Sequence, residues 1–305
     1  MLGLMFSFVL SMANAAGWTS EHEAVWDSQA HAWITLADLA PRSAAGDIFV
    51  LGEEHATADS VTLPSTFIHH DNQVRLLNEL RTYSAANGTS VSVGMEFLTY
   101  TFQDSVDRFH SGQMSEVDFL AAVHWGGNPF EFYRSQILFQ GGGRTLALNI
   151  PAAIASRAAK VGPLGLTADE RRFLPPVWQR GNAAYFERFK DIMGGHVPAE
   201  KLENYFWAQS LWDDTMAWKA LEHRLALPKD ILLIIVGQFH VRFGGGLPHE
   251  LKVIGRAPVK SIVQIEASDW DPNTLNALVA PDVVYGEQAD YIWVHTGARA
   301  KALSH

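Results

Sequence analysis

Short apolar segments alternate with longer helical segments along most of this 305-residue chain, and this alternation constrains the fold more than any other feature. Turn residues bound six apolar runs of strand length, at 48–51, 91–96, 145–149, 231–236, 261–265 and 291–294. Helical periodicity and capping residues predict helices at 70–86, 115–123, 151–160 and 198–225. Strands that alternate with helices in this way form sheets with crossover helices. We therefore predict an α/β fold with a central parallel or mixed sheet flanked by helices.

The segment 163–227 has helical patterning throughout and lies between the third and fourth predicted strands. We predict that it is a helical insertion over the carboxyl ends of the strands, where it could form a lid. Thr167 and Glu170 form a capping box within it. Before the insertion, the sequence from Asn128 predicts a helix that carries Arg134 in its opening turns.

The first residues of the chain are typical of an exported protein. Residues 1–15 carry no charged side chain, contain a continuous apolar run and end in Ala-Asn-Ala, which predicts a signal peptide; a buried N-terminal helix is the alternative. The run is shorter than a membrane span, and no later segment is apolar enough, so we expect no integral membrane segment after cleavage. No Pro-, Gly- or Ser-rich linker divides residues 16–305, so we expect a single domain in the periplasm or secreted.

Composition excludes several kinds of site. The chain has no cysteine, which excludes disulfides, zinc–thiolate sites, covalent haem attachment and a lipid-modified N-terminus. Any metal must be held by His, carboxylate, Tyr or Met side chains. The net charge of −10, without a dense Lys/Arg run, argues against nucleic acid or an anionic membrane as the main partner.

Two similar turns follow two of the predicted strands. Gly52 to His55 and Gly237 to His240 are both Gly-x-x-His sequences after a buried apolar run, and Glu96 ends another predicted strand. Glycine after a strand permits a sharp turn or a close approach, and the histidine then points back over the strand end. Ligands collect beyond the carboxyl ends of such strands. We therefore expect the two imidazoles and this carboxylate to lie together.

This set of side chains suits two kinds of chemistry. His55, His240 and Glu96, with Glu53 or Glu54 beside them, are nitrogen and oxygen donors for a divalent metal such as Mn, Co, Fe or Zn. The same groups can act as general acids and bases without a metal. Two turns that each hold a satisfied structural histidine are the alternative.

Polar residues elsewhere also point toward the predicted site. Gln209 and Asp213 fall on the apolar stripe of the 198–225 helix, so we expect them to face a polar pocket, whereas a helix-to-loop tether is the alternative. Asp214 points elsewhere and is expected in solvent. Arg134 could hold an anionic group or form a surface ion pair, and Asn149 could reach the crevice or cap the next helix.

The ordered set of these motifs resembles the ChaN-like haem-binding uptake family of the Tiki/TraB/erythromycin-esterase-like superfamily, over roughly residues 45–265. The resemblance implies an α/β fold with a helical insertion, a bacterial envelope location and a role in haem or iron uptake. It also implies hydrolase relatives with paired Gly-x-x-His motifs, to which His55, Glu96 and His240 would correspond. The motifs that carry it are Leu51 to His55, Gly94 to Glu96, Tyr133-Arg134, Asn149 to Pro151, Ala208 to Ala217 and Val236 to Val241.

Two hypotheses from different classes follow. The first is a periplasmic haem-binding protein, in which a Trp-rich cleft holds the porphyrin, a Tyr or His ligates the iron, and Arg134 or another cation meets a propionate. The second is a metal-dependent hydrolase of protease or esterase type, built on the paired Gly-x-x-His residues. The expected partner is haem or another small molecule, and a homodimer is compatible with either hypothesis.

Overall fold

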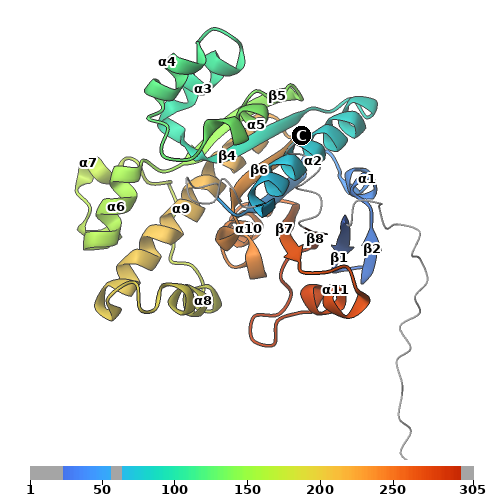
Figure 1. Cartoon of the computed structure of the whole chain (residues 1–305). Coiled ribbons are helices and arrows are strands. Elements are labelled where there is room, and N and C mark those ends of the chain that lie inside the picture. The colour runs from blue at the N-terminus through green and yellow to red at the C-terminus, as the bar shows by residue number, and fades with distance from the viewer. Residues whose placement is uncertain (1–22, 56–63, 297–305) are drawn as a thin grey trace, which may run out of the picture.

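The computed structural model describes residues 23–55 and 64–296, so the predicted signal peptide lies outside the described residues (Figure 1). The described residues form one eight-stranded sheet in the order β2-β1-β8-β7-β3-β6-β4-β5. The strands are β1 Glu23–Asp27, β2 Ala32–Ile34, β3 Ile48–Glu53, β4 Val91–Thr99, β5 Gly142–Asn149, β6 Ile231–Gly237, β7 Val259–Ala267 and β8 Tyr291–Thr296.

The sheet is mixed. The six strands from β8 to β5 are parallel to their neighbours, while β1 pairs antiparallel with β8 and β2 antiparallel with β1. All six strands predicted from the sequence are present, which confirms the α/β prediction. The two antiparallel strands at the edge were not predicted, because β1 and β2 are only five and three residues long.

Helices cover both faces of the sheet. They are α1 Leu36–Leu39, α2 Pro64–Ala86, α3 Gln103–His110, α4 Glu116–Ala122, α5 Arg134–Ile137, α6 Ala152–Val161, α7 Ala168–Arg171, α8 Ala183–Met193, α9 Ala199–Ala226, α10 Leu247–Val253 and α11 Pro272–Val279. Within the described ranges, no helix is long and apolar enough to cross a membrane.

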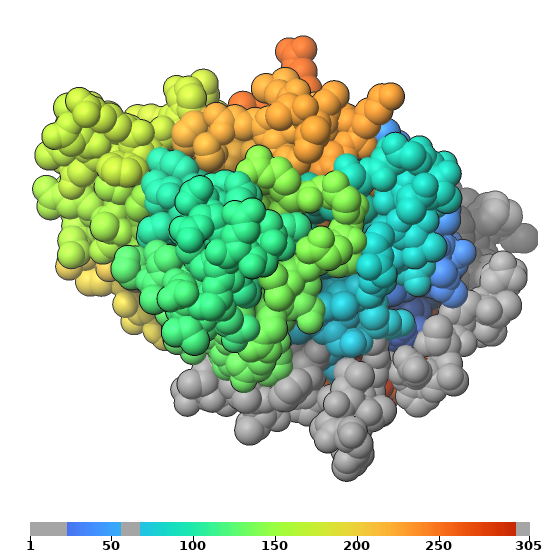
Figure 2. All heavy atoms as spheres, turned by 90° about the horizontal axis from the view of Figure 1, so that it is seen from above, coloured from blue at the N-terminus to red at the C-terminus, as the bar shows by residue number. Residues whose placement is uncertain are grey.

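Two apolar cores lie on opposite faces of the sheet. Phe49 and Leu51 of β3 pack in the core that includes α2, whereas Ile48 and Val50 pack in the core that includes α9, α10 and α11. Alternate residues of a strand point to opposite faces, so a strand that is apolar throughout must be covered on both. Figure 2 shows α3, α4 and α5 forming a continuous outer layer beside α2, with the α6–α7 segment projecting at one side.

Most of the segment between β5 and β6 is helical, as expected, but residues 172–182 and 194–198 are not. The Thr167–Glu170 capping box is present, and α9 matches the predicted long helix, with Pro198 before its first residue. The helix expected from Asn128 is wrong in detail. A 3-10 turn at Phe130–Phe132 precedes the four-residue α5, and the Asn128 side chain caps neither.

Candidate functional site

The two Gly-x-x-His turns converge on Glu96. Strands β3 and β6 are neighbours in register, with Glu53 opposite Gly237, so their turns leave the same edge of the sheet side by side. Glu96 lies between the two imidazoles, with Oε2 3.5 Å from Nε2 of His55 and Oε1 3.4 Å from Nε2 of His240. The structure thus brings together the three side chains that the sequence singled out.

Gly237 permits this close approach. A Cβ atom at this position would lie only 2.5 Å from Nε2 of His55, well inside van der Waals contact. The backbone N–H of Gly237 also donates a hydrogen bond of 2.6 Å to Oε2 of Glu96. The glycine therefore lets the His55 ring lie against the end of β6, because a side chain at this position would displace that ring.

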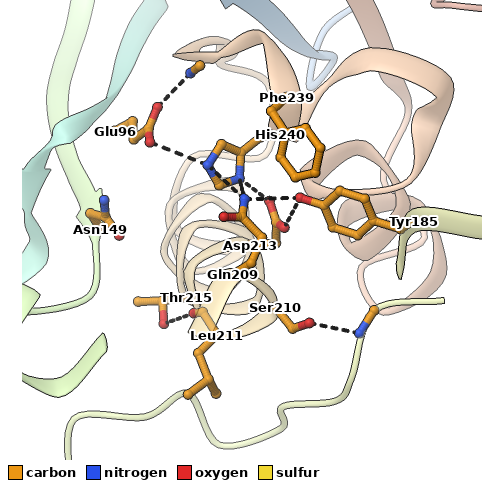
Figure 3. A network of polar contacts seen from close by, with 12 residues as sticks. Glu96, Asn149, Tyr185, Gln209, Ser210, Leu211, Asp213, Thr215, Phe239 and His240 are labelled. Carbon is orange, nitrogen blue, oxygen red and sulfur yellow. Dashed lines mark hydrogen bonds and ion pairs between the residues drawn. The ribbon is translucent and has the colours of Figure 1, made fainter. Parts of the chain in front are cut away.

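Residues of the helical insertion hold His240 from the other side (Figure 3). Nδ1 of His240 donates to Oδ1 of Asp213 at 2.7 Å, and the amide nitrogen of Gln209 lies 3.0 Å from the same ring atom. The hydroxyl of Tyr185 donates to the second Asp213 oxygen at 2.9 Å and accepts from Gln209 at 3.1 Å. Gln209 and Asp213 thus contact a site residue, as the sequence suggested.

Charge within the site is strongly coupled. Burial alone would lower the pKa of His240, but Asp213 and Glu96 raise that pKa to about 10. Burial alone would raise the pKa of Glu96, but His240 and His55 hold that pKa well below its usual range. Burial also opposes the charged form of His55, yet its contact with Glu96 raises the pKa of His55. At neutral pH the centre is therefore an imidazolium flanked by two carboxylates.

Glu53 and Glu54 have different environments. The carboxylate of Glu53 is buried, accepts a hydrogen bond of 2.8 Å from the Tyr133 hydroxyl and another from the Gln73 amide, and lies 3.7 Å from Nδ1 of His70. Burial raises the pKa of Glu53 to about 7 despite the opposing effect of His55. The Glu54 side chain is exposed. Of the two, Glu53 has the environment of a general base.

Asp214 is buried, and its predicted exposure is wrong. Its Oδ2 accepts a hydrogen bond of 2.8 Å from the backbone N–H of Gln179, while the Gln179 amide donates to the buried Glu250 at 2.9 Å. Burial raises the pKa of Asp214 to about 9, and the neighbouring Glu250 carboxylate adds to this rise. The raised pKa favours the protonated form of the Asp214 carboxyl group at neutral pH. The segment 173–182 covers this face of α9, which helical periodicity could not reveal.

Two other sequence candidates have partners outside the network. Arg134 forms a two-bond ion pair with Glu116 of α4, with both contacts at 2.7 Å, and stacks on the Phe130 ring. It therefore adopts the surface ion pair that was the alternative prediction. Asn149 is the last residue of β5, and its Oδ1 accepts a hydrogen bond from the backbone N–H of the next residue, Ile150. This side-chain hydrogen bond therefore stays within the chain turn and does not reach His240.

Arg188 of α8 is a site neighbour that sequence reasoning missed. It is buried and donates to the backbone carbonyls of Phe239 and Arg242, which flank the His240 turn, and its guanidinium lies 4.5 Å from the centre of the Phe239 ring. Tyr185, on the same helix, was also missed. Neither residue belongs to a recognisable motif, and only the packing of α8 against the turn gives them a role.

The donors at the site are bonded to one another. In the part of the chain that the structure describes, no group of three or more His, Asp or Glu side chains is arranged to hold a metal ion. The histidines still supply two imidazole nitrogens beside the Glu96 carboxylate. A carboxylate on the second nitrogen, as Asp213 provides for His240, commonly orients a metal-bound histidine.

Comparisons with known proteins agree with this architecture. The family model described as "Haem-binding uptake, Tiki superfamily, ChaN" matches residues 39–251. The solved structure "Cofacial heme binding to ChaN of Campylobacter jejuni" is similar to this chain with a TM-score of 0.65 and 16% identity, over 90% of this chain and 98% of that one. No curated protein sequence matches the chain.

Two further solved structures match the chain at lower TM-scores. A mutant of the erythromycin esterase EreC in its open conformation has a TM-score of 0.43 and 8% identity, over 83% of this chain and 90% of that one. The type III effector HopBA1 has a TM-score of 0.41 and 11% identity, over 86% and 91%.

Proposed function

The chain belongs to the ChaN family of haem-binding uptake proteins in the Tiki superfamily, and from this premise we propose that it binds haem and serves haem or iron uptake. The family match over residues 39–251 is the observation that carries the proposal. The uncharged apolar start of the sequence supports a place in the periplasm or outside the cell.

Side chains around His55 fit a porphyrin. The His55 side chain is 39% exposed, and its ring lies 4.8 Å from that of Phe97, which in turn contacts Tyr133 at 4.7 Å and Trp125 at 6.2 Å between ring centres. Aromatic walls suit a flat apolar ligand, and His is one of the iron ligands open to a chain without cysteine. When bound, haem would supply an iron centre, and His55 with the partly exposed Phe97 and Trp125 would hold it, while the buried Tyr133 supports the Phe97 ring from behind.

An absorbance titration of the purified protein with haemin tests the proposal. We expect a saturable Soret shift in the wild type and in His196→Ala, a variant of an exposed histidine on another surface. A weakened shift in His55→Ala would support binding beside this residue. A shift kept in His55→Ala but lost in a Tyr variant would move the haem elsewhere in the molecule, and the absence of any saturable shift would overturn haem binding.

The geometry at Glu96 favours a second candidate function, a metal-dependent hydrolase. Two imidazoles on one carboxylate, with the buried Glu53 nearby, form a set of acids and bases whose pKa values differ widely. A divalent Mn, Co, Fe or Zn ion would supply a Lewis acid, and His55, His240 and Glu96 would hold it. Elemental analysis of protein equilibrated with these metals tests this, because a stoichiometric metal must disappear in the His55→Ala/His240→Ala double variant. Unchanged metal content and ester hydrolysis in that variant would contradict it.

A further inference from the structure

A cavity lies away from the Gly-x-x-His residues, along the last turns of α9. Its volume is about 440 Å³, and a neighbouring cavity of the same size shares Leu227 with it. Volumes in this range are typical of small-molecule sites. The residues that line the first cavity are Tyr100, Gln103, Arg144, Leu146, Ala147, Lys219, Glu222, His223, Ala226 and Leu227.

The cavity is separated from the site by the length of the helix. Asp213 contacts His240, whereas His223, ten residues later on α9, lines the cavity. A helix rises about 1.5 Å per residue, so roughly 15 Å of helix lies between these two positions. The cavity is therefore a separate place on the molecule and not an arm of the Glu96 centre.

Two cationic side chains, Lys219 and Arg144, line this cavity together with the Glu222 carboxylate. The Lys219 ammonium lies 4.0 Å from the centre of the Trp218 ring and 4.9 Å from that of Tyr100, and its side chain is only 23% exposed. Arg144 adds a guanidinium that is half exposed. Aromatic faces stabilise a partly desolvated cation, so Lys219 is held in place beside the cavity.

The carboxylates that now pair with these cations can be replaced. Lys219 contacts Glu222 at 2.6 Å and Arg144 contacts Asp107 at 2.5 Å, but both acidic side chains are at least 42% exposed. Exposed pairs of this kind contribute little to stability, so the carboxylate of a ligand can compete for the cations.

The rest of the lining is mixed, with aliphatic residues beside the polar Gln103 and His223. Leu146, Ala147, Ala226 and Leu227 line the first cavity, and Leu227 continues with Pro228 into the second. The Leu227 side chain is 42% exposed. We infer that this groove binds an amphipathic carboxylate with an aliphatic chain, its carboxylate on Arg144 and Lys219 and its chain along Leu227. The aliphatic residues favour such a chain over a flat aromatic ring.

Calorimetric titration of the full protein with oleate below its micelle concentration tests the inference. We expect saturable binding that becomes roughly tenfold weaker, about 1.4 kcal/mol, in the double variant Arg144→Gln/Lys219→Gln. The matched control is Lys252→Gln, a lysine on α10 that also pairs with an exposed carboxylate. Oleyl alcohol, which lacks the carboxylate, should bind the wild type and the double variant alike.

A second variant, which fills the groove, tests whether oleate binds there. Ala226→Phe places a ring in the groove and should abolish oleate binding while the thermal midpoint and the haemin titration stay as in the wild type. No saturable oleate binding, or equal affinity in the double variant and the Lys252→Gln control, would overturn the inference. Groove variants that weaken haemin but leave oleate unchanged would also overturn it. Failure of haemin to bind the wild type bears on the proposed haem function alone.

Discussion

Removal of the His240 imidazole should destabilise the fold strongly. His240 lies between Glu96 and Asp213, whose side chains are only 4% and 2% exposed. His240→Ala leaves both carboxylates buried without the cation that they share. Breaking a buried ion pair by removing one partner costs about 3–5 kcal/mol. Glu96 keeps its hydrogen bond from Gly237 and Asp213 keeps its hydrogen bond from Tyr185 in this variant, so we expect the loss in unfolding free energy to stay within that range.

The loss should depend on pH in a defined direction. The folded pKa of His240, about 10, is above its ordinary value of 6.5, so its contribution is complete below 6.5 and declines as pH rises through 10. The folded pKa of Glu96 lies below its ordinary value of 4.5, so its contribution is present above 4.5 and lost as pH falls. The penalty of His240→Ala is therefore greatest between 4.5 and 6.5 and smaller toward pH 10.

Urea denaturation at about pH 6 and about pH 9 measures both effects. We expect the unfolding free energy to fall by about 3–5 kcal/mol at the lower pH, with a drop in Tm of roughly 6–20 °C, and by less at the higher pH. His196→Ala, at an exposed position, is the control. A loss below about 1 kcal/mol, or one that grows with pH, would refute the idea of an imidazolium held between two carboxylates.

Three further changes test other contacts. Gly237→Ala should lower the unfolding free energy by about 1–3 kcal/mol, toward the low end because the partly exposed His55 ring can swing outward. NMR titration should then show the raised pKa of His55 returning toward its ordinary value. Asp214→Asn should flatten the alkaline part of the stability profile, because the folded pKa of about 9 makes the stability of the wild type decline from pH 3.8 to 9. An unchanged slope in urea titrations would contradict the raised pKa of Asp214. Glu53→Gln should be more stable than the wild type above pH 7. The pKa of about 7 means that the protonated Glu53 carboxyl group stabilises the wild-type fold at low pH, and this contribution is lost as the pH rises through 7. Equal unfolding curves at all pH values would count against the raised pKa of Glu53.

Patterns that depend on burial could be predicted from the sequence. The central strands β3 and β6 are buried at every residue, and their continuous apolar runs predicted them from the sequence. The Gly-x-x-His turns were also visible, because a glycine directly after such a run has a backbone reason to be there. Strands β1 and β2 were not predicted, because strands of five and three residues are too short to show a clear pattern of apolar residues.

Contacts between segments could not be predicted in the same way. Glu53 and Glu54 are neighbours in the sequence, and only the register of β3 sends one side chain into the core and the other to solvent. Asp213 and Asp214 point to different faces of α9, yet both are buried because segment 173–182 covers the second face. The place of Tyr185 at the site could not be predicted, since it depends on a hydrogen bond to Asp213 on another helix.

The charge balance of the centre bears on both candidate functions. A cation at His55 and His240 must compete with the protons that Glu96 and Asp213 hold on those rings, so metal binding would release protons and strengthen as pH rises. Haem beside His55 would meet a ring that is partly exposed, whereas the His240 ring is buried and lies between Glu96 and Asp213. The same carboxylate that orients His55 also increases the basicity of its ring. Both functions need a neutral imidazole at His55, but the metal centre also requires the His240 ring to lose a proton, so metal binding should depend more steeply on pH than haem binding.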